Sequence, residues 1–522
     1  MSPVLPPSAA PAADTRLPRQ IPYIIGNEAC ERFSFYGMRN ILVPFLVTSL
    51  MLAYAPEAER QGIAKDVFHT FVIGVYFFPL LGGWLSDRFF GKYNTIFWLS
   101  VVYVIGHAFL AVFEDNRTGF YTGLFLIALG SGGIKPLVSA FVGDQFTQAN
   151  KHKAKVVYDA FYWTINFGSF FASLLIPPLL KHYGPSVAFG IPGVLMALAL
   201  FIFWLGRNKY VLQPPAPPNP HSFMRVVMTA LGAGGRGKAV AGLGAVAALV
   251  SLAMWPLGRL EFVPAFCLAL VFAMAFGGIG ASMQLDRARG VHPDDAVDGV
   301  RAVLRILIVF ALVTPFWSLF DQKASTWVLQ GELMTKPSWF QSAQMQALNP
   351  LLVMLIIPFN NLLLYPMLRR MGFDVTPLRR MGVGIAFSSL AWIAAGMLQL
   401  QIDGGTPTSI VWQVLPYALL TFGEVLVSAT GLEFAYSQAP PSMKGTIMSF
   451  WMLAVTVGNL WVLLTNSAVR SEGFKGWIAG TGMGETAFLM FFFAAFAMVA
   501  ALVFGLYARR YPMQDFYRSG AA

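Results

Sequence analysis

The chain has 522 residues, of which 56% are hydrophobic and only 12% are charged. This charged share is about half that of a typical soluble domain, so the composition argues against a water-soluble fold. The net charge of +11 is compatible with nucleic-acid binding, but in a membrane protein Lys and Arg gather in the loops on one side. We therefore expect no nucleic-acid partner.

Fourteen segments have the length and apolar character of a membrane-spanning helix, which needs about 20 residues to cross the hydrocarbon. Every backbone amide must be satisfied inside lipid, and the segments lack the alternation of β-barrel strands, so we expect an all-α polytopic membrane fold. In chain order, the expected spans are 21–50, 67–86, 93–113, 118–142, 160–180, 182–206, 239–258, 262–285, 302–323, 348–368, 381–402, 411–434, 445–469 and 486–508.

The distribution of basic residues predicts the orientation of the chain in the membrane. Lys and Arg are concentrated in the N-terminal tail, the even-numbered loops and the C-terminal tail, so both termini are expected to be cytoplasmic. Arg16 and Arg19 precede an apolar run, but that run contains charges and no cleavage site, so no removable signal peptide is expected. Cys30 and Cys267 are isolated thiols and support neither a disulfide framework nor a metal centre.

The two spans at 239–258 and 262–285 follow a Pro-rich linker and contain few polar residues. We interpret them as an insertion between two six-helix halves. Two such halves joined by a cytoplasmic linker form the major facilitator fold, in which substrate binds near the midplane between the halves. The expected organisation is a tail over 1–20, an N-terminal bundle over 21–210, a linker with the inserted pair over 211–300, a C-terminal bundle over 301–510 and a tail over 511–522.

The loop after the second span carries a further mark of this fold. Its sequence, Gly82-Gly83-Trp84-Leu85-Ser86-Asp87-Arg88-Phe89-Phe90-Gly91-Lys92, matches the Gly, Asp-Arg, Gly-basic pattern of major facilitators. We expect Gly83 to permit a close helix approach, and Asp87 and Arg88 to act in gating at a moving cytoplasmic interface. The alternative is that these charges only follow the positive-inside rule.

The first span contains ionisable residues where a lipid-facing helix would have none. A charge at the bilayer centre costs at least roughly 2.5 kcal/mol, so such groups face a cavity, pair with one another and mark transport pathways. Helical spacing also makes Glu28 and Arg32 an i, i+4 pair. We therefore expect a solute transporter. At 3.6 residues per turn, one stripe is formed by Glu28, Glu31, Arg32, Phe35, Tyr36 and Arg39.

Charges of opposite sign occur in the two halves at matching depth. The N-terminal half contributes Arg32 and Lys135, and the C-terminal half contributes Asp321 and Glu424. Such charges can form bridges between the halves that break as the halves rock. We expect Lys135, Asp321 and Glu424 to take part in gating.

Several of these segments together resemble a known family. The Glu-x-x-Glu-Arg-Phe-x-x-Tyr-Gly run at 28–37 is similar to the signature of the proton-dependent oligopeptide transporters, and so are Gly-Gly-Ile-Lys-Pro at 132–136 and Phe-Gly-Glu at 422–424. The resemblance extends to Phe-Tyr-Trp-x-Ile-Asn-x-Gly at 161–168 and to Asn349-Pro350. It implies a bacterial inner-membrane symporter that imports di- and tripeptides with protons. No cofactor other than the coupling protons is implied, and we expect a monomer in the lipid bilayer.

The resemblance also implies roles for individual residues. A zwitterionic peptide would place its carboxylate at Arg32 and Lys135 and its amine at Glu424. Protons would be carried by Glu28, Glu31 and Asp321, and their protonation would release Arg32. The remaining substrate contacts implied by the family pattern are Asn166 and Asn349 for the peptide amides, and Tyr36, Tyr76, Trp317 and Trp451 for its side chains.

Three positions bear on how closely the family pattern applies. Phe35 stands where the family usually has a second tyrosine, and Asp321 stands where many members have glutamate. His69 resembles the second-span histidine of animal peptide transporters, to which proton coupling is attributed. An imidazole suits a proton relay because it titrates near neutral pH, although a lone histidine at a helix end is more often solvated.

Two other function classes remain open from the sequence. A related carrier could move a non-peptide anion such as nitrate, but the complete acidic motif in the first span favours proton-coupled peptides. An integral membrane enzyme would need a nucleophile with its base or a metal cluster, and the sequence has no His- or Cys-rich constellation of that kind. We therefore expect a transporter and not an enzyme.

Overall fold

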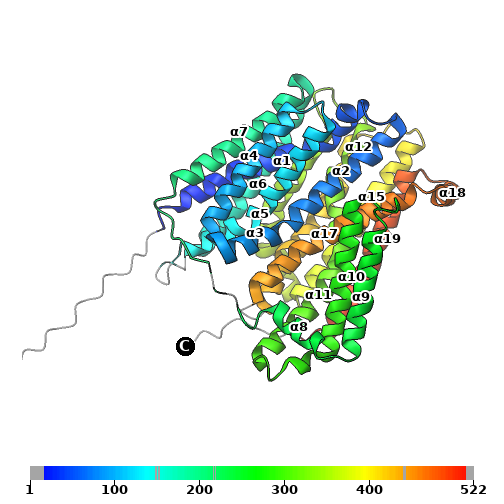
Figure 1. Cartoon of the computed structure of the whole chain (residues 1–522). Helices are drawn as coiled ribbons and strands as arrows, with labels where there is room; N and C mark the ends of the chain where they lie inside the picture. The colour runs from blue at the N-terminus through cyan, green and yellow to red at the C-terminus, as the bar shows by residue number, and fades with distance from the viewer. Residues whose placement is uncertain are drawn as a thin grey trace, which may run out of the picture.

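The computed structural model describes residues 17–146, 150, 153–215, 217, 219–438 and 443–512, and these residues are almost entirely helical (Figure 1). Residues 1–16 and 513–522, which make up most of the two expected tails, lie outside the described residues. Within the described ranges, thirteen helical stretches are long and apolar enough to cross a membrane. The expected all-α membrane fold is confirmed.

The stretch Glu57–Val112 contains two of the fourteen expected spans. Its 56 residues would measure about 84 Å as one helix at roughly 1.5 Å per residue, far more than the ~30 Å hydrocarbon layer. The chain turns at Gly91, whose φ of +72° favours glycine. Along α5, the residues that touch α2 and α3 follow the same order as in those helices, whereas those that touch α4 follow the reverse order. The stretch therefore crosses twice, which agrees with fourteen spans.

The first seven helices form one compact group. Their apolar faces, from Ile21 to Tyr210, share one hydrophobic core, to which Ala324 and Leu329 of the other half are added. This group fills the blue and cyan part of Figure 1. Its helices are α1 (Ile21–Thr48), α2 (Glu57–Phe77), α3 (Pro79–Leu85), α4 (Gly91–Val112), α5 (Arg117–Asp144), α6 (Ala154–Tyr183) and α7 (Pro185–Leu205).

Most of the remaining helices share a second hydrophobic core, which runs from Phe223 to Phe504. Two of them, α9 (Arg236–Ala253) and α10 (Phe262–Gln284), pack on each other as the green hairpin in Figure 1 and correspond to the inserted pair. The short α8 (Phe223–Gly232) precedes this hairpin. The others are α11 (Asp294–Asp321), α12 (Thr326–Glu332), α13 (Leu348–Phe359), α14 (Tyr365–Arg370), α15 (Pro377–Asp403), α16 (Val414–Gln438), α17 (Lys444–Val469), α18 (Glu472–Gly480) and α19 (Glu485–Arg510).

The two halves meet where α2 packs on α17, where α6 packs on α13 and where α1 contacts α12. Several of these helices contain proline, including Pro44 in α1 and Pro315 in α11. Proline removes one backbone hydrogen bond and kinks a helix. The interface between the halves is where the ionisable residues of the spans gather.

Close helix packing at the cytoplasmic motif depends on Gly82 and not on Gly83, contrary to our expectation. A Cβ on Gly82 would collide with the backbone of Gly133 in α5, whereas a Cβ on Gly83 would meet nothing within 4 Å. Gly82 is on the buried face of α3, and Gly83, one residue on, is turned about 100° away at 3.6 residues per turn. Asp87 and Arg88 are exposed and form no ion pair within the described ranges, so their gating role stays a prediction.

We predict that Gly82→Ala lowers the thermal stability of the purified protein, because the added methyl group meets backbone atoms that cannot move aside. The expected loss is about 1–3 kcal/mol or more, as for other overpacked cores. Thermal unfolding in detergent, followed by intrinsic fluorescence, measures it. Gly83→Ala is the matched control and should leave the midpoint unchanged; equal midpoints for the two variants would contradict the assignment.

Candidate functional site

The stripe expected on the first span is present on α1 and faces the protein interior. The Arg32 Nε atom lies 2.6 Å from Glu28 Oε1 and 2.8 Å from Glu31 Oε2, and all three side chains are buried. Two carboxylates therefore share one guanidinium. When both are ionised the group carries one excess negative charge, and a buried excess charge is costly. The group is a place where a proton can be bound.

A second buried ion pair joins the two halves. Arg39 of α1 places its Nη2 atom 2.7 Å from Asp321 Oδ1 of α11. We expected Asp321 to reach toward Arg32, and this expectation is wrong. Arg32 is already held by carboxylates on its own helix, whereas Arg39 lies two turns further along the same stripe, beside the end of α11. The stripe thus carries two arginines. Arg32 pairs with carboxylates of the N-terminal half, and Arg39 pairs with a carboxylate of the C-terminal half.

His69 belongs to the same network and is fully buried, so the alternative of a solvated histidine is wrong. Its Nδ1 atom lies 2.6 Å from Asn459 Oδ1, and its Nε2 atom lies 3.1 Å from Ser325 Oγ. Asn459 of α17 also donates its Nδ2–H to Asp321 Oδ2 at 2.8 Å. A continuous chain of hydrogen bonds therefore connects the imidazole on α2 with the carboxylate that pairs with Arg39.

Lys135 of α5 has a cationic head among aromatic rings. Its Nζ atom lies 4.2 Å from the centroid of the Phe35 ring and 4.8 Å from that of Tyr76. It is buried, and no described residue hydrogen-bonds with it. The phenylalanine that departs from the family pattern thus presents a ring face to this ammonium, which cation–π attraction stabilises. An ammonium whose donors are unused is available to an anionic ligand.

On the other half, Glu424 of α16 is held by Asn349 of α13. The Asn349 Nδ2–H donates to Glu424 Oε2 at 2.5 Å and lies 3.0 Å from Thr421 Oγ1. Lys323 follows α11 and lies with its Nζ atom 3.0 Å from the centroid of the Phe320 ring. Both Glu424 and Lys323 face the same cavity. The C-terminal half therefore supplies a carboxylate and an ammonium to it.

A cavity of about 140 Å³ lies between the halves and collects most of these groups. Ligand pockets usually measure roughly 300–1,000 Å³, so the cavity must widen before a peptide-sized molecule can enter. Its walls come from α1, α2 and α6 on one side and from α11, α13 and α16 on the other. The lining residues that the sequence predicted as substrate contacts are Tyr36, Tyr76, Asn166, Trp317, Asn349 and Glu424.

Three predicted substrate contacts lie outside this lining. Arg32 and Lys135 are set behind the aromatic wall on the N-terminal side, and Trp451 packs behind Trp317 with ring centroids 5.9 Å apart. Two charged lining residues were not predicted as site residues, namely Arg39 and Lys323. Arg39 could have been predicted as a site residue from its place on the α1 stripe. Lys323 could have been predicted from its position two residues after Asp321.

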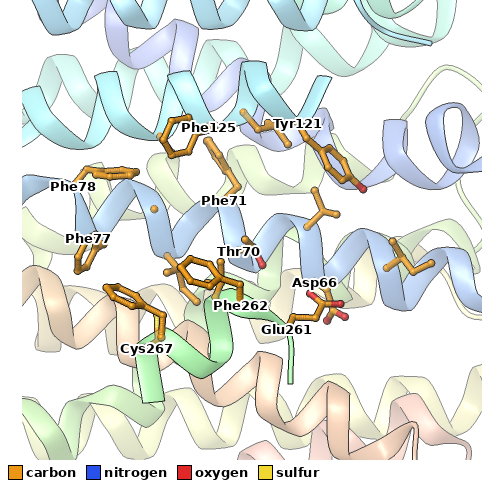
Figure 2. Close-up of a pocket in the computed structure, with 18 of the residues that line it drawn as sticks. Asp66, Thr70, Phe71, Phe77, Phe78, Tyr121, Phe125, Glu261, Phe262 and Cys267 are labelled. Carbon is orange, nitrogen blue, oxygen red and sulfur yellow. The ribbon is translucent and has the colours of Figure 1, made fainter. Parts of the chain in front are cut away.

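A larger cavity of about 550 Å³ lies elsewhere, between α2, α5 and α10, and Figure 2 shows its aromatic walls. It contains none of the candidate residues. We place the functional site in the smaller cavity, because that is where ionisable groups and hydrogen-bonding side chains of both halves converge.

Comparison with known proteins agrees with this arrangement. The sequence profile of the POT family, the proton dependent oligopeptide transporters, matches residues 93–474. The chain belongs to the POT family. The resemblance found in the sequence is thereby confirmed, and membership of this transporter family excludes the alternative of an integral membrane enzyme.

This POT family chain is similar to transporters of animals. Mouse (Mus musculus) solute carrier family 15 member 2 is 33% identical over 437 residues, which are 79% of the chain and 54% of that protein. The chain thus spans about half the length of the curated relatives it matches.

Two solved structures match over nearly their whole length. An auto-inhibited POT family peptide transporter is 65% identical, with a TM-score of 0.93 over 96% of this chain and 99% of that one. The POT family transporter PepTSo is 66% identical, with a TM-score of 0.93 over 96% of this chain and 100% of that one. The fold of the POT chain is therefore that of a solved transporter.

We predict that Arg39 and Asp321 are strongly coupled in stability. Arg39→Met leaves a buried carboxylate unpaired, which costs roughly 3–5 kcal/mol, and a second change of Asp321→Asn should restore part of the loss. Thermal unfolding of the two single variants and the double variant measures the coupling. The partly exposed pair of Lys92 and Asp144 is the control, with a coupling of about 1 kcal/mol or less. Additive effects in both pairs would contradict a buried bridge between the halves.

Proposed function

We propose that this protein is a secondary active transporter that imports di- and tripeptides by proton symport through alternating access. The observation that carries the proposal is that both halves supply charged groups to one cavity and are joined across it by Arg39 and Asp321. The names of the solved relatives, which are peptide transporters, support the substrate class. We further propose a monomer in a bacterial inner membrane with both termini in the cytoplasm, as the distribution of basic residues indicates.

The charges in and behind the cavity suit the two ends of a zwitterionic peptide. Glu424, oriented by Asn349, is the acceptor for the peptide amine. Lys135 carries unused donors and is the first group to meet the peptide carboxylate once the aromatic wall of Phe35 and Tyr76 opens. Arg32 lies behind this wall and becomes available only when its carboxylate partners release it.

The backbone and the side chains of the peptide require less specific contacts. Asn166 and Asn349 line opposite walls and can hydrogen-bond to peptide amides. Tyr36, Tyr76 and Trp317 form the walls for side chains, with Trp451 supporting Trp317 from behind. Aromatic walls accept many shapes, so a broad range of peptide side chains is expected.

Protons act on both ion-pair groups. Protonation of Glu28 or Glu31 weakens the hold on Arg32, and protonation of Asp321 weakens the bridge from Arg39 to the other half. The hydrogen-bond chain through Asn459 couples His69 to Asp321, so a proton bound by the imidazole changes the charge balance at the carboxylate. The halves then separate at Asp321 and Glu424, while Asp87 and Arg88 act at the cytoplasmic end.

We predict that proteoliposomes containing the protein accumulate labelled dialanine when the outside is acidified. Unlabelled tripeptide should compete for uptake and nitrate should not. The proposed site has a carboxylate, Glu424, for the peptide amine and, apart from it, an ammonium, Lys135, for the peptide carboxylate. Uptake of label with each competitor measures this. Competition by nitrate without competition by tripeptide would favour the alternative of a non-peptide anion carrier.

We predict that Glu31→Gln, Asp321→Asn and His69→Gln each remove acid-driven accumulation, because each takes away a group that binds or relays a proton. Exchange of peptide across the membrane in counterflow should survive, since the amine and carboxylate contacts remain. Uptake and counterflow are measured in the same vesicles.

His107→Gln is the control for the histidine. His107 is also buried in the N-terminal half, but it bonds to Ser34 and lies outside the network of Asp321. It should keep acid-driven uptake. Undiminished acid-driven uptake in both carboxylate variants would rule out the proposed coupling.

A further inference from the structure

The 550 Å³ cavity between α2, α5 and α10 has an apolar part and a polar end. Figure 2 shows Phe77, Phe78 and Cys267 toward one end of the cavity, and Asp66 and Glu261 toward the other. Phe125 and Phe262 line it and are about half exposed on the outside of the helix bundle. Since these rings lie on membrane-spanning helices, the cavity faces the acyl chains of the bilayer.

The inserted hairpin forms one wall of this cavity and contacts both halves. A small apolar cluster joins Cys267 of α10 to Ile73 of α2 and to Leu460 and Leu463 of α17. The cavity lies beside this cluster, where α10 stands away from α5. It is therefore bounded by the N-terminal half on one side and by the insertion on the other.

The polar end contains three charged groups at the level where helices begin and end. Asp66 accepts hydrogen bonds from Arg470, at the end of α17, and from Asn466 at 3.0 Å. Glu261 directly precedes α10, is exposed and forms no ion pair within the described ranges. The net charge of Asp66, Glu261 and Arg470 is minus one. With the cytoplasmic termini proposed above, this end lies at the outer surface of the membrane.

From these observations we propose that the cavity is a binding site for a phospholipid of the outer leaflet with an ethanolamine headgroup. One acyl chain lies along the aromatic walls formed by Phe77, Phe78 and Phe266, and the headgroup lies at the polar end. The primary ammonium pairs with Glu261, and the phosphate meets Arg470, whose side chain remains 48% exposed beside Asp66.

The charge of the polar end decides between headgroups. An unpaired carboxylate attracts an ammonium that can donate hydrogen bonds, so it favours ethanolamine over the anionic glycerol headgroup. The Arg470 guanidinium suits the phosphate that both lipids carry. Because α10 and α17 both line or adjoin the site, the lipid would fill the space between the insertion and the N-terminal half.

Photo-crosslinking of the full chain in phosphatidylcholine vesicles tests the proposal. Two probes with the same diazirine acyl chain are compared, phosphatidylethanolamine and phosphatidylglycerol, and labelled peptides are located by mass spectrometry. The ethanolamine probe should label the segments around Phe77 and Phe266 about fivefold more strongly, the factor expected for one charge at a membrane surface. Val263→Trp, which fills the cavity, should lower labelling by both probes.

Glu261→Gln should reduce labelling by the ethanolamine probe to the level of the other, and it should not affect folding because Glu261 is exposed. The control is Glu57→Gln. Glu57 is another exposed carboxylate, at the start of α2, and this variant should keep the preference for the ethanolamine probe. Equal labelling by the two probes in the unmodified chain, or an unchanged preference in Glu261→Gln, would overturn the proposal. Loss of peptide uptake in an otherwise correctly labelled chain would count against the proposed function and not against the lipid site.

Discussion

The ion pair between Arg39 and Asp321 is the interaction on which the arrangement of the two halves depends. It joins α1 to α11 across the cavity, and both side chains are almost fully buried. Two buried charges are tolerable only while they stay together, because separating them leaves each without compensation. The charge of the Asp321 carboxylate therefore controls one of the ion pairs that join the halves, and Asp66 with Arg470 forms another.

The surrounding side chains make that condition responsive to protons. The second carboxylate oxygen of Asp321 accepts a hydrogen bond from Asn459, and Asn459 also hydrogen-bonds with His69. The carboxylate is therefore linked to a titratable imidazole on the other half. The group of Glu28, Glu31 and Arg32 lies two turns from Arg39 on the same face of α1. It has two carboxylates for one guanidinium. Glu424 lines the wall on the C-terminal side, and Lys135, of opposite charge, lies behind the Phe35 and Tyr76 rings on the N-terminal side. Thus α1 carries both arginines whose carboxylate partners are the proposed proton-binding groups.

Much of the fold could be predicted from the sequence, because it depends on local properties of the chain. The fourteen apolar segments reappear as helices, although the spans predicted to begin at 67 and 302 begin earlier, at Glu57 and Asp294. The i, i+4 spacing predicted the contact of Glu28 with Arg32. Contacts between distant segments were harder to predict. Nothing in local spacing distinguishes Arg32 from Arg39 as the partner of Asp321, since both lie on one stripe. Likewise, adjacent glycines look alike in sequence, and only the position of α5 shows that Gly82 is the one in contact.

The central claim is that protonation of Asp321 opens the outer side of the protein by releasing Arg39. Spin labels at Glu57→Cys on α2 and Gly473→Cys on α18, with Cys30 and Cys267 replaced, report the separation of the halves on that side by electron–electron double resonance. The account predicts one short distance in the unmodified chain at neutral pH. Added Asp321→Asn should populate a longer distance at the same pH. An unchanged distance distribution in Asp321→Asn would contradict the claim.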